Sequence, residues 1–342
     1  MRKENLMEDF VSKRKLDVIV NDAATSDDPK ENDSFISVSS INNFLEKGKQ
    51  MDEPRQLVNR IVVEHEATFL FGDTGIGKTI LAIQMACLMA MLGKKVLYVN
   101  FELSEQQLAM RYPKKVFPET FYIANIDYSR MHDVTEQSHI LEEIQRLALE
   151  RGIDVVVIDN FTNLCINSKE GSEAGNIMLQ LLSLRRTHNW TMLILAHVPK
   201  RKPGDPLTLN DLAGSKILSN LADNVIGLNK SKKDKDLRYI IQLKYRSFPI
   251  ELDYKNVQEL RLTTSDNWLH FEFGGYDEER AHLPRTRDEK AELERDIVKE
   301  LKEPNGLSYR AIANKLGTSL GMVQRTAKSY GLAKKVVGTT KK

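Results

Sequence analysis

The stretch GDTGIGKT, residues 72–79, decides the fold of this chain. It matches the phosphate-loop pattern G-x-x-x-x-G-K-[ST] at every fixed position. An apolar strand pattern, ATFLFG, leads into it, and a helical pattern, TILAIQMACLMAMLG, leads out of it. In that context the backbone N–H groups of the loop gather at a helix N-terminus and attract phosphate oxygens. A chance glycine-rich turn would lack this strand–loop–helix order, so the sequence predicts a nucleotide site.

Each position of this loop has its own chemical reason. We expect Gly72, Gly75 and Gly77 to adopt positive φ and to bring the backbone close to phosphate. Lys78 supplies a positive charge to the β- and γ-phosphates, and the Thr79 hydroxyl is a ligand for Mg²⁺. The predicted ATP-binding set is Gly72, Asp73, Thr74, Gly75, Ile76, Gly77, Lys78 and Thr79.

Strand and helix patterns alternate on both sides of the loop. Strand patterns lie at 67–72, 95–102, 154–160 and 191–197, and helical patterns lie at 79–93, 104–113, 139–152 and 175–189. Such alternation predicts an α/β fold with a mainly parallel sheet that is covered on both faces. Shorter strand patterns follow at 224–230, 237–245 and 268–273.

Asp159 ends the apolar strand DVVVIDN, at the carboxyl edge of the predicted sheet. One interpretation is an ordinary strand-end aspartate that caps a turn. The phosphate loop favours another, in which Asp159 accepts a hydrogen bond from Mg²⁺-bound water or from Thr79. The next residue, Asn160, is an amide and cannot take a proton, so a catalytic base must come from elsewhere.

Two further strands end in titratable side chains at the same predicted edge. Glu102 ends KVLYVNFE, and His197 ends TMLILAH. We predict Glu102 as the base that activates water and His197 as a sensor that donates a hydrogen bond to the γ-phosphate. The alternative for Glu102 is a salt-bridged acid that caps the next helix.

The phosphate loop together with Glu102, Asp159 and His197 resembles the RecA-like ATPase family. Within it, the chain is similar to ring-forming replicative helicases of the plasmid RepA type and their DnaB-like relatives. In that family the catalytic glutamate ends the strand after the phosphate-loop helix, which is the place of Glu102. AAA+ proteins would instead carry the glutamate at position 160. The resemblance covers about residues 34–275 and implies a Mg²⁺-dependent ATP hydrolase that forms a hexameric ring.

The resemblance also assigns roles to two basic segments. In such rings the loop after the sensor strand holds single-stranded DNA, which makes Lys200, Arg201 and Lys202 candidate phosphate contacts. A Lys-x-Arg pair on a later strand reaches the neighbouring subunit's γ-phosphate, which makes Arg246 the candidate finger with Lys244 beside it. The alternatives are a solvated loop and a pair of exposed strand cations.

The C-terminal segment LSYRAIANKLGTSLGMVQRTAKSYGL, residues 307–332, resembles a helix-turn-helix. Its predicted second helix would expose Gln324, Arg325 and Lys328 to base edges or phosphates, and Arg310 would contact the backbone. Between Pro304 and Lys342 there is no Asp or Glu, whereas there are eight Lys and Arg residues. This charge pattern favours duplex DNA as the partner over a small interaction module that touches no DNA.

The predicted organisation has four parts, given by residue ranges. They are a disordered segment at 1–33, a linker or docking segment at 34–60, an ATPase domain at 61–280 and a basic helix-turn-helix domain at 285–342. Two cysteines in 342 residues exclude a disulfide framework, and neither a signal peptide nor a membrane span is expected, so we predict a cytoplasmic location.

Two functions from different classes fit these features. The first is a DNA helicase or single-strand translocase of a plasmid, phage or mobile element. The second is an ATP-switched DNA-binding regulator or a recombinase-like protein that does not unwind duplex DNA.

Overall fold

The computed structural model describes residues 36–127, 137–165, 171–199, 201, 205–212, 216–265, 268–304 and 306–332. The predicted disordered segment 1–33, Lys200, Lys202 and the tail from 333 lie outside the described residues. The chain divides into two units, of which the first ends at Glu53 and the second begins at Pro54.

The first unit contributes one described helix, α1 (Ile41–Lys49). Ser40 caps it, because its hydroxyl accepts a hydrogen bond from the Asn43 N–H at 3.2 Å. Every residue of α1 is exposed. The predicted linker, 34–60, reaches past this helix into the second unit, where Leu57 and Val58 are buried.

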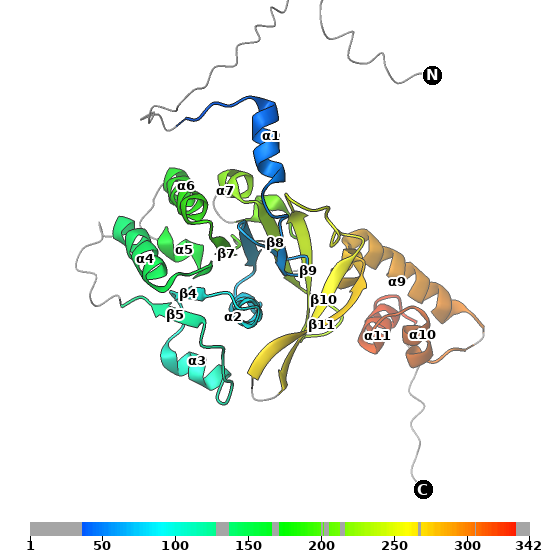
Figure 1. Ribbon diagram of the computed structural model, residues 1–342. Helices are drawn as coiled ribbons and strands as arrows, with labels where there is room; N and C mark the ends of the chain where they lie inside the picture. The colour runs from blue at the N-terminus through cyan, green and yellow to red at the C-terminus, as the bar shows by residue number, and fades with distance from the viewer. Residues whose placement is uncertain are drawn as a thin grey trace, which may run out of the picture. The chain divides into compact units, whose positions relative to one another are not determined.

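The second unit is built on a nine-stranded sheet (Figure 1). In spatial order its strands are β11 (Trp268–Asp277), β10 (Val257–Ser265), β9 (Leu237–Lys244), β8 (Asn224–Lys230), β3 (Ala67–Gly72), β7 (Thr191–His197), β6 (Val155–Asp159), β4 (Val96–Asn100) and β5 (Phe121–Asn125). Neighbours from β5 to β8 run parallel, and β9, β10 and β11 add an antiparallel extension. The predicted α/β fold with a mostly parallel sheet is confirmed.

Helices cover both faces of the parallel part of this sheet. On one face, α2 (Lys78–Met91) packs with a small hairpin, β1 (Gln56–Val58) and β2 (Val62–Val63). On the other face lie α4 (Gln137–Arg151) and α6 (Gly171–His188). Short helices fill the connections: α3 (Glu105–Arg111), α5 (Phe161–Leu164), α7 (Lys216–Leu221) and α8 (Glu279–His282).

The antiparallel extension returns to the helix that follows the phosphate loop. Gln84, a polar residue in the buried part of α2, donates to the Phe271 carbonyl at 2.8 Å and accepts from the Phe271 N–H at 2.8 Å. This paired contact joins α2 to β11 and satisfies an amide that would otherwise be buried without partners.

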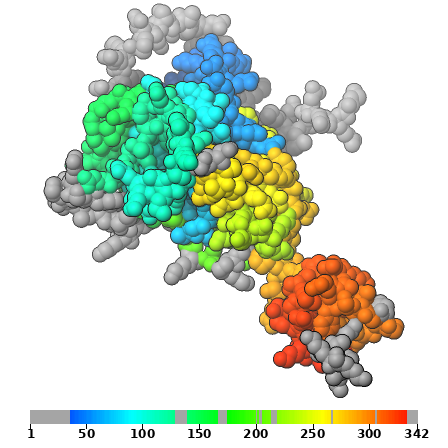
Figure 2. Space-filling view, turned by 90° about the horizontal axis from the view of Figure 1, so that it is seen from below, coloured from blue at the N-terminus to red at the C-terminus, as the bar shows by residue number. Residues whose placement is uncertain are grey.

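Three C-terminal helices, α9 (Arg287–Lys302), α10 (Tyr309–Lys315) and α11 (Leu320–Ser329), share a small apolar core (orange to red in Figure 2). The core contains Leu293, Ile297, Ile312, Ala313 and Val323. Ser308 and Ser319 cap α10 and α11, and Gly317 turns between them with φ +55°. The assignment of this segment as a helix-turn-helix and its binding to DNA stay predictions. No described helix is long and apolar enough to cross a membrane.

Candidate nucleotide site

The phosphate loop connects β3 to α2, and its glycines serve two different needs. Gly75 and Gly77 have φ of +71° and +107°, as predicted. Gly72 does not, and the expectation of positive φ there is wrong. A Cβ at Gly72 would lie 2.3 Å from the Leu228 carbonyl oxygen of β8, so this position requires glycine for space. At Gly77 a Cβ would also meet the Phe271 ring at 2.8 Å.

Lys78 begins α2 and turns its ammonium back over the loop. Its Nζ donates to the carbonyls of Gly72 at 2.9 Å and Asp73 at 3.1 Å, and it lies 3.2 Å from His197 Nδ1. The side chain is buried, and this burial lowers the pKa of Lys78 to about 8, against the opposing attraction of Asp159 and Glu102. The ammonium therefore lies at the loop and is hydrogen-bonded to two carbonyls, which phosphate oxygens can replace as acceptors.

This lowered pKa predicts a pH dependence of ATP binding. Below pH 8 Lys78 is mostly protonated and can pair with phosphate, whereas above pH 8 the free protein loses that charge. We expect the dissociation constant for ATP to rise by up to about tenfold per pH unit above 8. Fluorescence titration with a labelled ATP analogue between pH 7 and 9.5 measures this dissociation constant. A constant value over that range would contradict the assignment of Lys78 as the residue that pairs with phosphate.

Asp159 ends β6 and is 2% exposed. Tyr98 donates its hydroxyl to Asp159 Oδ2 at 2.7 Å, and Thr79 also forms a side-chain hydrogen bond with this carboxylate. Burial raises the pKa of Asp159, while these two hydrogen bonds oppose the rise. The Thr79 hydroxyl at the start of α2 and the Asp159 carboxylate at the end of β6 are hydrogen-bonded to each other. Such oxygen groups are the ligands that Mg²⁺ prefers. The residues present therefore fit a Mg²⁺ ion.

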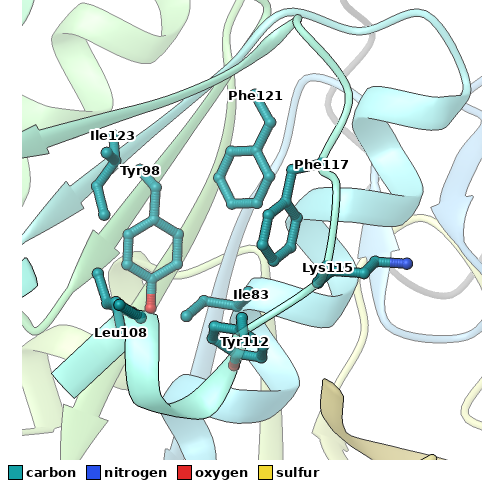
Figure 3. Close-up of a pocket in the computed structure, with 9 residues that line it drawn as sticks. Ile83, Tyr98, Leu108, Tyr112, Lys115, Phe117, Phe121 and Ile123 are labelled. Carbon is teal, nitrogen blue, oxygen red and sulfur yellow. The ribbon is translucent and has the colours of Figure 1, made fainter. Parts of the chain in front are cut away.

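An apolar cavity of about 320 Å³ lies on the α2 side of β4 (Figure 3). Its aromatic lining comes from Tyr98, Tyr112, Phe117 and Phe121. Tyr98 lines the cavity with its ring and reaches Asp159 with its hydroxyl. Tyr98 therefore connects the lining of the cavity to the carboxylate of the site.

Glu102, His197 and Asn160 meet beside Lys78, although they come from three different strands. Glu102 Oε1 lies 3.0 Å from His197 Nε2 and also accepts a hydrogen bond from Asn160 Nδ2. Since Lys78 has only protons to offer, His197 Nδ1 accepts, and its Nε2–H donates to Glu102. The His197 hydrogen bond lowers the pKa of Glu102 in spite of partial burial, so this carboxylate is ionised at neutral pH.

Asn160 is the residue of this cluster whose role the sequence does not predict. It is 1% exposed, and its Oδ1 has no hydrogen-bond partner among the described residues. The peptide bond between Asp159 and Asn160 is cis. The side-chain amide of Asn160 donates to Glu102, and the neighbouring Asp159 carboxylate is hydrogen-bonded to Thr79. Two adjacent residues therefore connect the predicted base with the predicted metal-binding pair.

Comparison with known proteins finds similar sequences over the part of the chain that contains the phosphate loop. A family model described as an AAA domain matches residues 40–203. DNA repair protein RadA from Streptococcus pneumoniae is 27% identical over 195 residues, which are 55% of this chain and 41% of that protein. RadA from Chlamydia pneumoniae is 30% identical over 178 residues, 48% of this chain and 33% of that protein.

Over this stretch, which contains the phosphate loop, Glu102 and Asp159, the chain is similar to an AAA domain and to RadA. The matched region spans less than half the length of these relatives. Among solved structures, a KaiC-like protein from Pyrococcus horikoshii aligns with a TM-score of 0.46 and 18% identity, over 61% of this chain and 90% of that one.

Arg201, one of the predicted DNA contacts, lies against the phosphate loop. Its guanidinium pairs with Asp73 of the phosphate loop, with Nε 3.1 Å from Oδ1, and the side chain is 9% exposed. Its predicted contact with a DNA backbone stays a prediction. Of the predicted basic loop, Lys200 and Lys202 lie outside the part of the chain that the structure describes.

Arg238 is a residue of the site that the sequence did not reveal. It is buried at the start of β9, and its Nε donates to the Ile76 carbonyl of the phosphate loop at 3.2 Å. It therefore supports the loop from the antiparallel side of the sheet. The signal that could have revealed it is a single arginine next to the apolar residues of this strand.

Lys244 and Arg246 lie at the opposite edge of the ATPase domain from the phosphate loop. Six residues of extended strand separate Arg238 from Lys244, a span of roughly 20 Å. Lys244 Nζ donates to the carbonyls of Ser219 at 2.9 Å and Ala222 at 2.6 Å, at the end of α7. Lys244 is therefore anchored in its own chain rather than free beside a finger.

Arg246 is half exposed and pairs with Asp223, with Nη1 2.7 Å from Oδ1. Asp223 is fixed in turn by the Ala67 N–H at 3.0 Å, at the start of β3. Arg246 therefore cannot reach the phosphate loop of its own chain. Its role as a finger that acts on a neighbouring subunit stays a prediction.

The predicted DNA contacts of the C-terminal helices are exposed. Arg310 on α10, and Gln324, Arg325 and Lys328 on α11, all face solvent. Lys315 forms an ion pair with Glu300 of α9 at 2.7 Å. Three polar side chains on one helix can meet a nucleic acid together, so the exposure agrees with the predicted role without testing it.

Proposed function

We propose that this chain is a Mg²⁺-dependent ATP hydrolase that acts on DNA, as a hexameric ring that moves along single-stranded DNA and separates duplex strands. The observation that carries the proposal is the meeting of Lys78, Glu102 and the Thr79–Asp159 pair at one edge of the sheet. These groups supply a phosphate-binding charge, a base and a metal-binding pair within one site.

In this proposal each residue has a defined task. Lys78 exchanges its carbonyl partners for phosphate oxygens, and Glu102, which is ionised, accepts the proton of the attacking water. Thr79 and Asp159 hold Mg²⁺, which when bound spreads the charge of the β- and γ-phosphates. His197 lies between Lys78 and Glu102, so a change at the phosphate position is transmitted to the base.

Two observations support DNA as the partner. The curated relatives are DNA repair proteins, and α11 presents Gln324, Arg325 and Lys328 on an exposed surface. Cations that neutralise phosphates make binding strongly dependent on salt. We therefore include duplex DNA, read by the C-terminal helices, beside the single strand in the ring.

The test measures ATP hydrolysis and strand separation in the same samples, with and without single-stranded DNA. DNA-stimulated hydrolysis with unwinding is the expected result, accompanied by a sixfold mass increase in the presence of ATP. Hydrolysis that DNA does not change, without unwinding, would contradict the proposed motor.

The names of the relatives favour a second candidate, an ATP-switched or recombinase-like DNA protein that does not unwind. Stable ATP-dependent binding to DNA with strand exchange and no strand separation would select it. Both candidates use the same nucleotide site, and they differ in what hydrolysis does to the DNA.

A trans-acting Arg246 makes a specific prediction for mixed oligomers. Arg246→Ala subunits and Glu102→Gln subunits should each be nearly inactive, because every interface lacks a finger or a base. Mixing them places an intact Glu102 against an intact Arg246 at some interfaces, so hydrolysis should partly return. The ATPase rate, measured at several mixing ratios of the two variants, shows whether hydrolysis returns. A rate that stays at the level of the separate variants would exclude a finger that acts between subunits.

A further inference from the structure

Asp73 is an unexpected residue for a loop that binds a triphosphate. It follows Gly72 directly, and its side chain is 31% exposed. A carboxylate this close to several phosphate charges opposes their binding by Coulomb repulsion, which partial burial strengthens. The site therefore needs a positive charge that neutralises Asp73 without occupying the place of the phosphates.

Arg201 meets this need with a two-point contact. Its Nε lies 3.1 Å from Asp73 Oδ1, and its Nη2 lies 3.3 Å from Asp73 Oδ2. A guanidinium matches a carboxylate in this paired geometry, whereas a lysine ammonium would offer only a point charge.

A chain of buried hydrogen bonds fixes Arg201 from behind. Its Nη2 donates to Asn229 Oδ1 at 3.0 Å, and Asn229 Nδ2 donates to the Tyr239 hydroxyl at 2.8 Å. The Tyr239 hydroxyl donates in turn to Glu279 Oε1 at 2.9 Å. Asn229 and Tyr239 are fully buried and Glu279 is 6% exposed, so β8, β9 and α8 together hold the guanidinium.

We propose that Arg201 is a positioning residue of the nucleotide site, which neutralises Asp73 so that the loop accepts a triphosphate, and that Asn229, Tyr239 and Glu279 hold it in place. The inference rests on the proposed ATP binding of this loop. Arg201 acts through Asp73 and needs no contact with either the phosphates or DNA.

A double-mutant cycle separates this role from the others. In Arg201→Gln the Asp73 charge is left unpaired, and the dissociation constant for ATP should rise by about 10- to 100-fold while kcat changes little. Asp73→Asn removes the charge that needs neutralising, so it should bind ATP at least as well as the wild type. Combining both changes should restore the affinity to within about threefold of the wild type.

The controls use matched pairs in the same protein. Arg261→Gln breaks another arginine–aspartate pair, with Asp234 at 3.0 Å, and should leave ATP affinity unchanged. Tyr239→Phe removes the hydroxyl that links Asn229 to Glu279 and should raise KM for ATP without lowering kcat. It therefore tests the supporting chain even if Arg201→Gln fails to fold.

The outcomes distinguish this inference from the proposed function. Wild-type protein that binds no labelled ATP would overturn the proposed function itself. Wild-type binding together with a double variant no better than Arg201→Gln would overturn the inference, because Arg201 would then act on the phosphates directly. Unchanged ATP affinity in Arg201→Gln, with weaker DNA binding, would overturn it in favour of a DNA contact.

Discussion

The Glu102→Gln variant is expected to bind ATP as tightly as the wild type and to hydrolyse it about 10²- to 10⁴-fold more slowly. Glutamine keeps the size of the side chain and can still meet His197 and Asn160, but its amide cannot accept a proton from water. Single-turnover hydrolysis, measured beside a binding titration, separates the two effects.

The matched control for this variant is Glu105→Gln, which neutralises an exposed acid in the first turn of α3. It should leave both binding and hydrolysis at the wild-type level. Turnover by Glu102→Gln at a rate close to that of this control would remove Glu102 from the role of base.

The Lys78→Ala variant is expected to lose ATP binding by about 100-fold or more, because removal of one partner from a buried charge pair costs several kcal/mol. The loop would keep its backbone N–H groups but lose the buried ammonium that faces Gly72 and His197. Titration with a labelled ATP analogue measures the loss, with Lys114→Ala as an exposed lysine control.

Lys78→Ala also distinguishes nucleotide binding from structural support. Its thermal stability without ATP should stay close to the wild-type value, since burial lowers the pKa of Lys78 and so disfavours its charged form in the folded protein. ATP should raise the melting temperature of the wild type and not that of the variant. An equal ATP-induced rise in both proteins would show that Lys78 does not bind the phosphates.

Local patterns predicted most of the ATPase domain. Strands β3 and β8 begin and end where their predicted strand patterns do, and α3 lies within its predicted helical pattern, with Ser104 and Gln107 forming a capping box. Four strands were missed: β1 and β2 of the small hairpin, and β5 and β10 of the nine-stranded sheet. β10 carries charged residues within its alternation and so lacks the apolar run of a central strand, whereas β1, β2 and β5 are only two to five residues long.

The lateral order of the strands explains what the sequence could not predict. Spacing alone places Glu102, Asp159 and His197 at strand ends, but their hydrogen bonds depend on β4, β6 and β7 being neighbours. The pair between Asp73 and Arg201 joins residues 128 positions apart and leaves no periodic signal. For the same reason the basic residues of a loop suggested DNA contacts, whereas its one arginine, Arg201, pairs with Asp73 of the phosphate loop.

The contact between α2 and β11 has a consequence for the order in which the protein is made. Gln84 bonds to the backbone of Phe271, 187 residues later, and the Phe271 ring packs against Gly77. A nascent chain on the ribosome contains GDTGIGKT long before it contains this partner. We therefore expect the growing polypeptide to gain ATP affinity only after β11 has left the exit tunnel, which delays nucleotide capture until nearly the whole ATPase domain is synthesised.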